Sequence, residues 1–186
     1  MNNLYLRCFS IGFIILLLDQ ASKVCIKTSF EPGESVVVFP WFFLHFVENN
    51  GFAFGYEFFG DFGKVFLTLF RVFFAFFVFR WLIFSIKKVG FTCGTISLLL
   101  IFSGATGNII DSVFYGVFFN YAPLLFGRVV DMFYFPLFES TYPDWIPLIG
   151  GDSFVFFGYI FNVADSAITI GAILLFFAHK ELSFNQ

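Results

Sequence analysis

Four stretches of this sequence are apolar enough to cross a lipid bilayer as helices. A spanning helix needs ~20 mostly apolar residues. The stretches lie at about residues 4–18, 65–86, 91–115 and 157–178. The composition agrees, because 12% of the residues are charged, whereas a soluble domain carries about 25%. The sequence therefore predicts an all-α integral membrane protein with four transmembrane helices.

The first stretch has some features of a secretory signal peptide, since Arg7 precedes an apolar run. No cleavage site of the small-x-small type follows it, and the next residues are Asp19, Gln20 and Ala21. We therefore expect an uncleaved first helix.

The segments between the four stretches differ in length. A tight turn at residues 85–90 carries Lys87 and Lys88, whereas residues 20–62 and 116–156 form two long loops on the opposite face. The basic residues divide evenly between the faces and do not settle the orientation. Of the 13 acidic residues, only Glu181 falls on the side of the short turn. We therefore expect the chemistry at the long-loop face, within a single domain of residues 1–186.

The charge and the cysteines argue against two classes of protein. The net charge of -3 is opposite to that of a generally basic nucleic-acid binder. Cys8, Cys25 and Cys93 are scattered and form no C-x-x-C pair. We expect them to be small apolar packing residues, and not a metal site or a disulfide framework.

The first long loop contains a β-branched and aromatic segment, residues 35–55, that partly alternates in polarity. Pro40 and Gly51 interrupt it, which favours short strands over a fifth span. We expect a small β-sheet at the membrane interface, formed by this first outer loop. Such a sheet could hold an extended peptide by strand addition.

Polar residues recur inside the third and fourth apolar stretches with the same spacing. Asn108 precedes Asp111 by three residues, and Asn162 precedes Asp165 by three. Residues three apart share one face of a helix, so each amide could orient a nearby carboxylate or a water. An ionisable group in a span costs ~2.5–3.5 kcal/mol on insertion scales, so such groups tend to be functional. The alternative for Asp111 is a purely structural acid at a helix end.

The first stretch ends in DQASK, where Asp19 and Lys23 are four residues apart and can pair. They could belong to a polar network, or they could be an ion pair that ends the helix at the headgroups. Small residues at 103–108, among them Gly104 and Gly107, predict close helix packing in the third stretch.

Five motifs together resemble the bacterial lipoprotein signal peptidase family, signal peptidase II. They occur in the family's order and extend over most of the chain. They are DQASK at 19–23, ENNGFAFG at 48–55, SGATGNIID at 103–111, GRVVDMF at 127–133 and FNVADSAI at 161–168.

The resemblance implies a four-helix protein of the bacterial inner membrane, with cytoplasmic termini and an active site near the outer leaflet. It implies an aspartic endopeptidase that needs no metal or other cofactor. Its substrate would be a prolipoprotein whose lipobox cysteine already carries diacylglycerol, cleaved just before that cysteine. We expect a monomer whose only other partner is membrane lipid, with no nucleic acid.

The resemblance also assigns roles to individual residues. Asp131 and Asp165 would be the catalytic pair, although the repeated N-x-x-D pattern alone would have paired Asp111 with Asp165. Asn162 would orient Asp165. Support or substrate contacts would come from Asp19, Lys23, Asn49, Asn108 and Asp111.

The chain departs from the family pattern in two respects. Ser112 stands where the family usually has an arginine after GNxxD, and Arg128 is a candidate to replace it. The loops are also lengthened, near residues 117–126 and 139–156. We expect these insertions to extend the outer loops, and they could form a lid over the substrate.

Three other functions are weighed against the peptidase. Asp111, Asp131 and Asp165 could bind Mg²⁺ in a membrane transferase, although no D-x-x-D cluster is present. Asp19 and Lys23 could serve a small transporter, which the absence of an inverted repeat argues against. Ser22 or Ser166 could form a Ser–Lys peptidase with Lys23, but adjacent residues such as Ser22 and Lys23 point in different directions on a helix.

Overall fold

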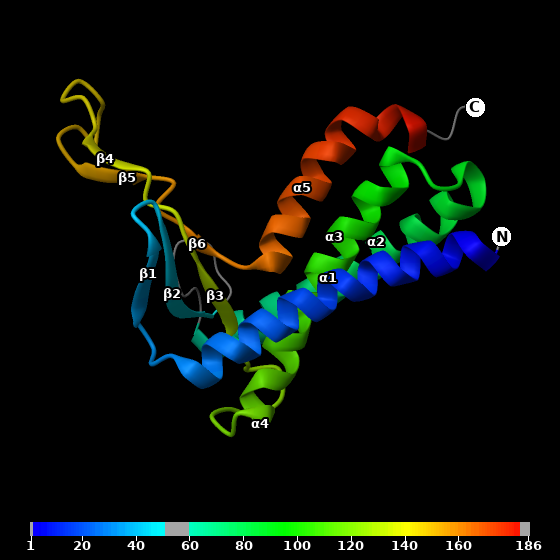
Figure 1. The fold of residues 1–186 in the computed structure, drawn as a ribbon, viewed down its shortest axis with the longest axis horizontal. Helices are drawn as coiled ribbons and strands as arrows, with labels where there is room; N and C mark the ends of the chain where they lie inside the picture. Colours follow the sequence, from blue (N-terminus) through cyan, green and yellow to red (C-terminus); the bar gives the residue numbers. More distant parts are fainter. Residues whose placement is uncertain (1, 51–59, 183–186) are drawn as a thin grey trace.

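The computed structural model describes residues 2–50 and 60–182. Its main body is a bundle of four helices, with β-strands at one end of the bundle and both described chain ends at the other (Figure 1). Four helices among the described residues are long and apolar enough to cross a membrane. The predicted fold class is thus confirmed. The helices are α1 (Asn2–Ser29), α2 (Gly60–Val89), α3 (Cys93–Ile110) and α5 (Val163–Ala178).

The largest differences from the expected helix boundaries are at the end of α1 and the start of α5. Helix α1 continues past Leu18 to Ser29, so the Asp19–Lys23 pair does not end it. Helix α5 begins at Val163, because the apolar residues just before it form β5 (Ser153–Phe156) and β6 (Ile160–Phe161). A short apolar run does not by itself distinguish a strand from a helix.

Helix α3 is extended by a π-helical turn, η2 (Asp111–Tyr115), and by α4 (Gly116–Phe118). Its start is fixed by Thr92, whose side chain accepts a hydrogen bond from the Thr95 amide in a capping box. The π turn begins at Asp111, and such turns often occur at functional sites.

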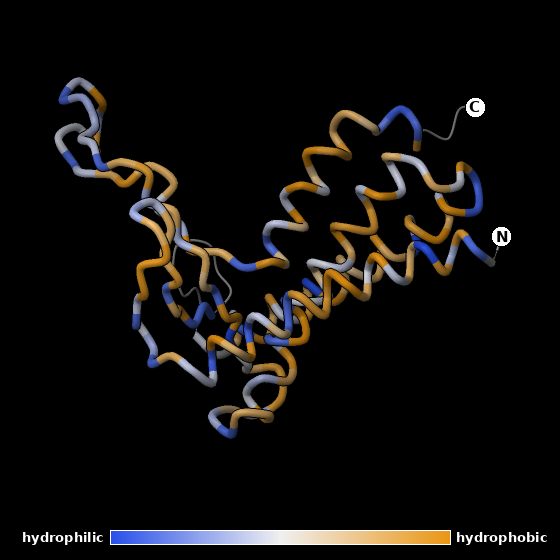
Figure 2. Tube along the Cα trace, viewed as in Figure 1, coloured by the Kyte–Doolittle hydropathy of each residue, from blue (hydrophilic) through white to orange (hydrophobic). Residues whose placement is uncertain are grey.

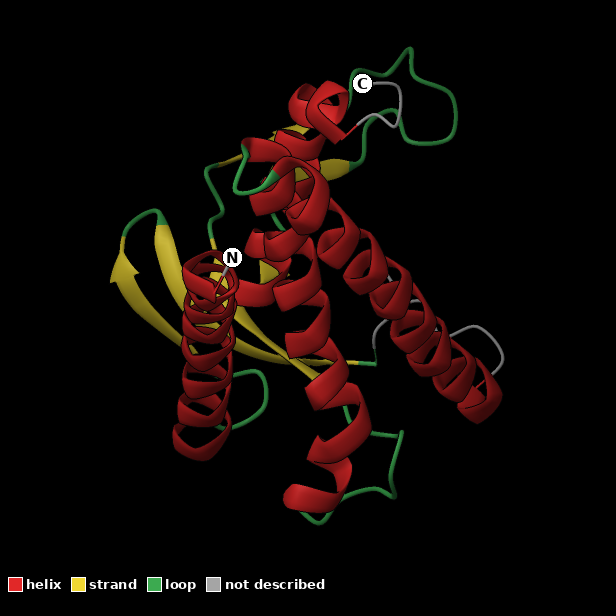
Figure 3. Ribbon diagram, turned by 90° about the vertical axis from the view of Figure 1, so that its right-hand side faces the viewer, coloured by secondary structure: helices red, strands yellow, loops and turns green. Residues whose placement is uncertain are grey.

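The strands form a wider sheet than the first loop alone could make. A four-stranded sheet has the order β1-β2-β3-β6, and all of its neighbouring strands are antiparallel. The first loop supplies β1 (Ser35–Phe39) and β2 (Phe42–Asn49), while the second supplies β3 (Val129–Tyr134) and β6. A separate hairpin of β4 (Phe138–Thr141) and β5 projects from this end of the molecule (Figures 1 and 3).

Glycines allow α3 to approach its neighbours closely. A Cβ atom on Gly104 would contact the carbonyl oxygen of Ala164 at the start of α5, and one on Gly107 would contact the Asp19 carboxylate of α1. The small residues of the third stretch therefore pack as predicted, and they also make room for a polar group.

The outer surface of the bundle is apolar. Large side chains of α2 are exposed at many positions, including Phe66, Phe70 and Phe73. In Figure 2 the helices are mainly hydrophobic, and hydrophilic positions gather where they meet the strands. This distribution is expected of helices whose exposed faces contact lipid.

Candidate active site

A buried lysine organises the polar residues where the helices meet the sheet. Lys23 of α1 is fully buried, and its Nζ lies 2.9 Å from Asp19 Oδ2 and 2.7 Å from Asp111 Oδ2. The same ammonium donates a hydrogen bond of 2.9 Å to Asn108 Oδ1. An ammonium has three hydrogens, so these acceptors satisfy Lys23. The predicted pair of Asp19 and Lys23 is confirmed, but it lies in the protein interior and not among headgroups.

Asp19 also connects α1 to the start of α5. Its Oδ1 accepts a hydrogen bond of 2.8 Å from the Ala164 amide. The first amides of a helix have no partners within that helix, and its positive end favours a carboxylate. Asp19 thereby fixes where α5 begins relative to α1.

Asn108 and Asp111 face the same cluster from α3 and η2. Asn108 Nδ2 donates to Asp165 Oδ1 at 2.8 Å, while its oxygen accepts from Lys23. The repeated spacing therefore places Asn108 and Asp111 on a common face, as predicted. Asp111 points to Lys23, however, and not to Asp165.

Asn162 caps α5 instead of lying within it. Its Oδ1 accepts from the Asp165 amide at 2.9 Å, and its own amide donates to Asp165 Oδ2 at 3.3 Å, which completes a capping box. The side-chain nitrogen of Asn162 donates to Asp131 Oδ1 at 2.7 Å. One fully buried asparagine therefore contacts both Asp131 and Asp165.

Asp131 lies on β3 with 3% of its surface exposed. Its Oδ2 accepts a hydrogen bond of 3.2 Å from Asn49 Nδ2 on β2. Burial, together with the negative charge of Asp165, raises the pKa of Asp131 to about 7. Hydrogen bonds from Asn49 and Asn162, together with the charge of Lys23, oppose this rise. Asp131 can therefore hold a proton near neutral pH while it remains close to a second carboxylate.

A pocket of about 410 Å³ opens beside Asp165. Its lining is mainly apolar, so this carboxylate is reached from a hydrophobic surface and not from bulk water alone. The lining residues are Phe157, Phe161, Asp165, Ser166, Thr169 and Ile170.

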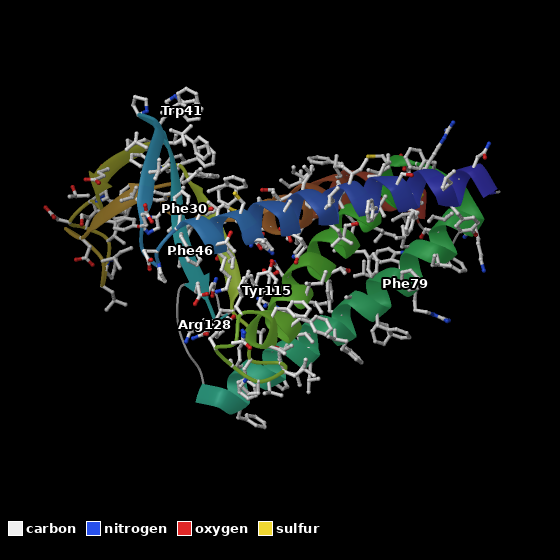
Figure 4. The ribbon with its side chains drawn as sticks, turned by 60° about the horizontal axis from the view of Figure 1, so that its bottom comes forward. Phe30, Trp41, Phe46, Phe79, Tyr115 and Arg128 are labelled. Carbon is white, nitrogen blue, oxygen red and sulfur yellow. The ribbon has the colours of Figure 1, made fainter. Side chains whose placement is uncertain are left out.

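The cluster includes two polar residues to which the sequence did not assign a role. Gln20 Nε2 donates to Asp19 Oδ2 and Asp111 Oδ1, both at 3.0 Å, and Tyr115 Oη donates to Gln20 Oε1 at 3.1 Å. Figure 4 shows Tyr115 between the helices, near their strand end. In the sequence, Gln20 could have been noticed because it lies directly beside Asp19, at the end of the first apolar stretch.

Arg128 lies apart from Ser112. Its Nη1 donates to Glu48 Oε2 at 3.1 Å, and its side chain is 48% exposed (Figure 4). Ser112 Oγ instead accepts a hydrogen bond of 2.9 Å from Arg71 Nη1 of α2. The segment ENNGFAFG is described only as far as Asn50, so residues 51–55 lie outside the described residues.

The geometry argues against two of the alternative functions. Ser22 and Ser166 donate to backbone carbonyls, whereas the ammonium of Lys23 is held by Asp19, Asp111 and Asn108. A Ser–Lys pair is therefore not formed. Within residues 2–50 and 60–182, no group of three or more His, Cys, Asp and Glu side chains is placed to hold a metal ion.

Known proteins resemble this chain over most of its length. Residues 11–180 match the family described as Signal peptidase (SPase) II. The lipoprotein signal peptidase of Porphyromonas gingivalis is 47% identical over 178 residues, which cover 87% of this chain and 77% of the relative. That of Pelodictyon phaeoclathratiforme is 34% identical, with coverage of 94% and 90%.

Two solved structures are similar in fold. Both are described as bacterial membrane enzymes determined by the in meso method, at 2.3 and 1.9 Å resolution. Each aligns with a TM-score of 0.63, at 26% and 27% identity, and covers 97% and 93% of this chain and 92% of its own.

The fold and the site together define a multi-pass membrane protein with a buried acid cluster where its spans meet a small sheet. The matches identify that protein more closely. The chain belongs to the signal peptidase II family and is therefore a peptidase, which confirms the resemblance found in its motifs.

Proposed function

We propose that the chain is an aspartic endopeptidase that removes the signal peptide from diacylglyceryl-modified prolipoproteins. Cleavage falls just before the lipidated cysteine. The observation that carries this proposal is that Asn162 contacts both Asp131 and Asp165 beside an apolar pocket. The names of the relatives, lipoprotein signal peptidases, support the substrate class.

Two carboxylates that share a proton supply what peptide hydrolysis needs. Like charges a few ångströms apart do not both ionise readily, so one acid keeps its proton. The pKa of Asp131, near 7, favours it as the protonated partner in the free enzyme.

In the proposed reaction, ionised Asp165 takes a proton from water as the water oxygen bonds to the scissile carbonyl carbon. Protonated Asp131 donates a hydrogen bond to the carbonyl oxygen, where negative charge develops. The carbon–nitrogen bond then breaks, and a carboxylic proton passes to the amine of the departing cysteine. Asn49 and Asn162 hold Asp131 in place throughout.

The position of the site at the helix ends suits a lipid-anchored substrate. Acyl chains on the cysteine keep the scissile bond at the depth of the headgroups, and the pocket beside Asp165 offers Phe157 and Phe161 to an apolar group. We propose that this face lies on the outer side of the bacterial inner membrane and that the enzyme acts as a monomer.

The test is cleavage of a lipidated lipobox peptide by the purified protein, beside the same peptide without lipid. We expect cleavage of the lipidated peptide only. Asp131→Asn and Asp165→Asn should each abolish it, whereas Asp152→Asn, at an exposed acid of the second loop, should not. Full cleavage by either candidate-site variant, with a native helical spectrum, refutes the pair. Loss of cleavage with EDTA that one metal restores would instead indicate metal-dependent hydrolysis and refute a reaction carried by the two carboxylates alone.

A further inference from the structure

Helix α2 places a positive charge beside the acid cluster. Arg71 lies within a membrane-spanning segment, with its side chain partly buried. Its Nη1 donates to Ser112 Oγ at 2.9 Å, and Ser112 Oγ donates to the Asn108 carbonyl at 2.9 Å. An arginine inside a span is costly and rare, so its presence suggests a role.

This arginine is connected to the proposed catalytic pair by contacts and by charge. Asn108, which Ser112 contacts through its carbonyl, donates its side-chain amide to Asp165. The charges of Asp165, Asp111 and Asp131 all act on the Arg71 guanidinium, with Asp165 the strongest of them. Two lysines are buried among the described residues. Lys23 is held between Asp19 and Asp111, and Lys64 of α2 donates to the Asn50 carbonyl at 2.9 Å.

We propose that Arg71 is a positioning residue that keeps Asp131 and Asp165 singly ionised at neutral pH. This inference rests on the proposed function of the pair. A nearby positive charge favours the ionised form of a carboxyl group. It therefore helps the pair to hold one negative charge in surroundings where burial opposes any charge. The hydrogen bond to Ser112 helps to hold the guanidinium on the side of the pair where Asn108 lies.

The charged groups around the pair come from every element packed against it. Helix α1 contributes the Asp19 carboxylate and the Lys23 ammonium. The π turn η2 contributes the Asp111 carboxylate, and α2 contributes the Arg71 guanidinium. On β2, Glu48 is paired with Lys27 and Arg128 at the outer edge of the sheet. Helix α2 also carries Lys64, whose ammonium donates to the Asn50 carbonyl. Removing the Arg71 charge changes the field at Asp165 and leaves the ion pairs of Lys23 in place.

The experiment compares pH profiles of cleavage of the lipidated peptide. Removing a positive charge raises both pKa values of the pair, so Arg71→Gln should move the whole profile to higher pH by on the order of one unit. Arg71→Lys should keep the profile near that of the wild type. Arg80→Gln removes the same charge from an exposed position of the same helix and should leave the profile unchanged.

An unshifted profile in Arg71→Gln overturns the inference, even if the rate falls at every pH, because a merely structural role predicts that result. Ser112→Ala is the second variant, to be used if Arg71→Gln does not fold. It removes one hydrogen bond of the guanidinium and should shift the profile upward by less. An unshifted profile in a folded Ser112→Ala protein likewise overturns the inference.

A measurement without turnover separates this inference from the proposed function. The carbonyl stretch of protonated carboxyl groups, followed by infrared difference spectroscopy, should titrate at higher pH in Arg71→Gln than in the wild type. The part of this carbonyl band that is missing in Asp131→Asn is assigned to the pair of Asp131 and Asp165. If the wild type cleaves nothing, the proposed function fails. If it cleaves while neither band nor profile shifts in the variant, the role of Arg71 fails.

Discussion

Replacing Asn162 by serine or by alanine separates its two structural roles. The residue caps α5 through its Oδ1 and holds Asp131 through its Nδ2. Serine is a good helix cap, whereas alanine at this position costs ~1 kcal/mol of stability. Neither residue can donate to Asp131 as the asparagine amide does.

The expected loss of activity follows from the hydrogen bond that Asp131 accepts from Asn162, because Asp131 becomes charged when it gives up its proton in the proposed reaction. Such a bond contributes ~1.5–3 kcal/mol, which corresponds to about a tenfold to a hundredfold fall in kcat/KM if it is retained in the transition state. The bond from Asn162 also lowers the pKa of Asp131. Its removal should therefore raise that pKa further and move the activity profile toward higher pH.

The assay pairs cleavage kinetics across pH with thermal unfolding in detergent. Asn162→Ser should unfold near the wild-type temperature yet lose activity, while Asn162→Ala should lose activity and also unfold earlier. Wild-type kinetics in Asn162→Ser would show that Asp131 is positioned without this amide. Equal destabilisation by serine and alanine would contradict the capping role.

Two further predictions concern stability. Lys23→Met leaves Asp19 and Asp111 buried without their cation and should cost ~3–5 kcal/mol; an unchanged unfolding temperature in detergent would contradict this account of the cluster. Gly104→Val places side-chain atoms against the carbonyl of Ala164 and should cost ~1–3 kcal/mol by overpacking. Phe176→Leu, on the exposed side of α5, should leave the unfolding temperature within error, and an equal loss in both variants would argue against close packing of α3 on α5.

Local spacing predicted the parts of the site that one helix determines. Asp19 and Lys23 pair because residues four apart on a helix are neighbours. Asn108 and Asp111 both reach Lys23 because residues three apart share one face of a helix. Helix α1 is longer than its apolar run predicts, because Asp19 and Lys23 pair within the helix and do not end it.

The remaining parts depend on contacts between distant segments. The same N-x-x-D pattern lies within a helix at Asn108 but caps a helix at Asn162. The difference arises because residues 160–161, just before Asn162, pair as a strand with β3. Asp131 carries no periodic signal of its own, so its assignment required the family resemblance. Arg71 was visible as a charge in a Phe-rich span, but its partner Ser112 lies on another helix.

The raised pKa of Asp131 also has a consequence for folding. The pKa is 3.8 in the reference state and about 7 in the folded protein, so between these values the folded state binds more protons than the unfolded one. Stability therefore falls as pH rises through this window, and the full penalty is present above pH 7. A shift of about three units corresponds to roughly 4 kcal/mol at most.

Asp131→Asn removes this titration and should therefore inactivate the enzyme while stabilising it. The gain in unfolding temperature over the wild type should be larger at pH 8 than at pH 5, because only the wild type must bury an ionised carboxyl group at the higher pH. Any effect of the new amide on stability that does not depend on pH cancels when the gains at the two pH values are compared. Asp152→Asn is the control for the loss of a carboxylate at an exposed position. If the gain were the same at both pH values, Asp131 would titrate alike in the folded and unfolded chains, and it could not hold the proton that the proposed reaction requires.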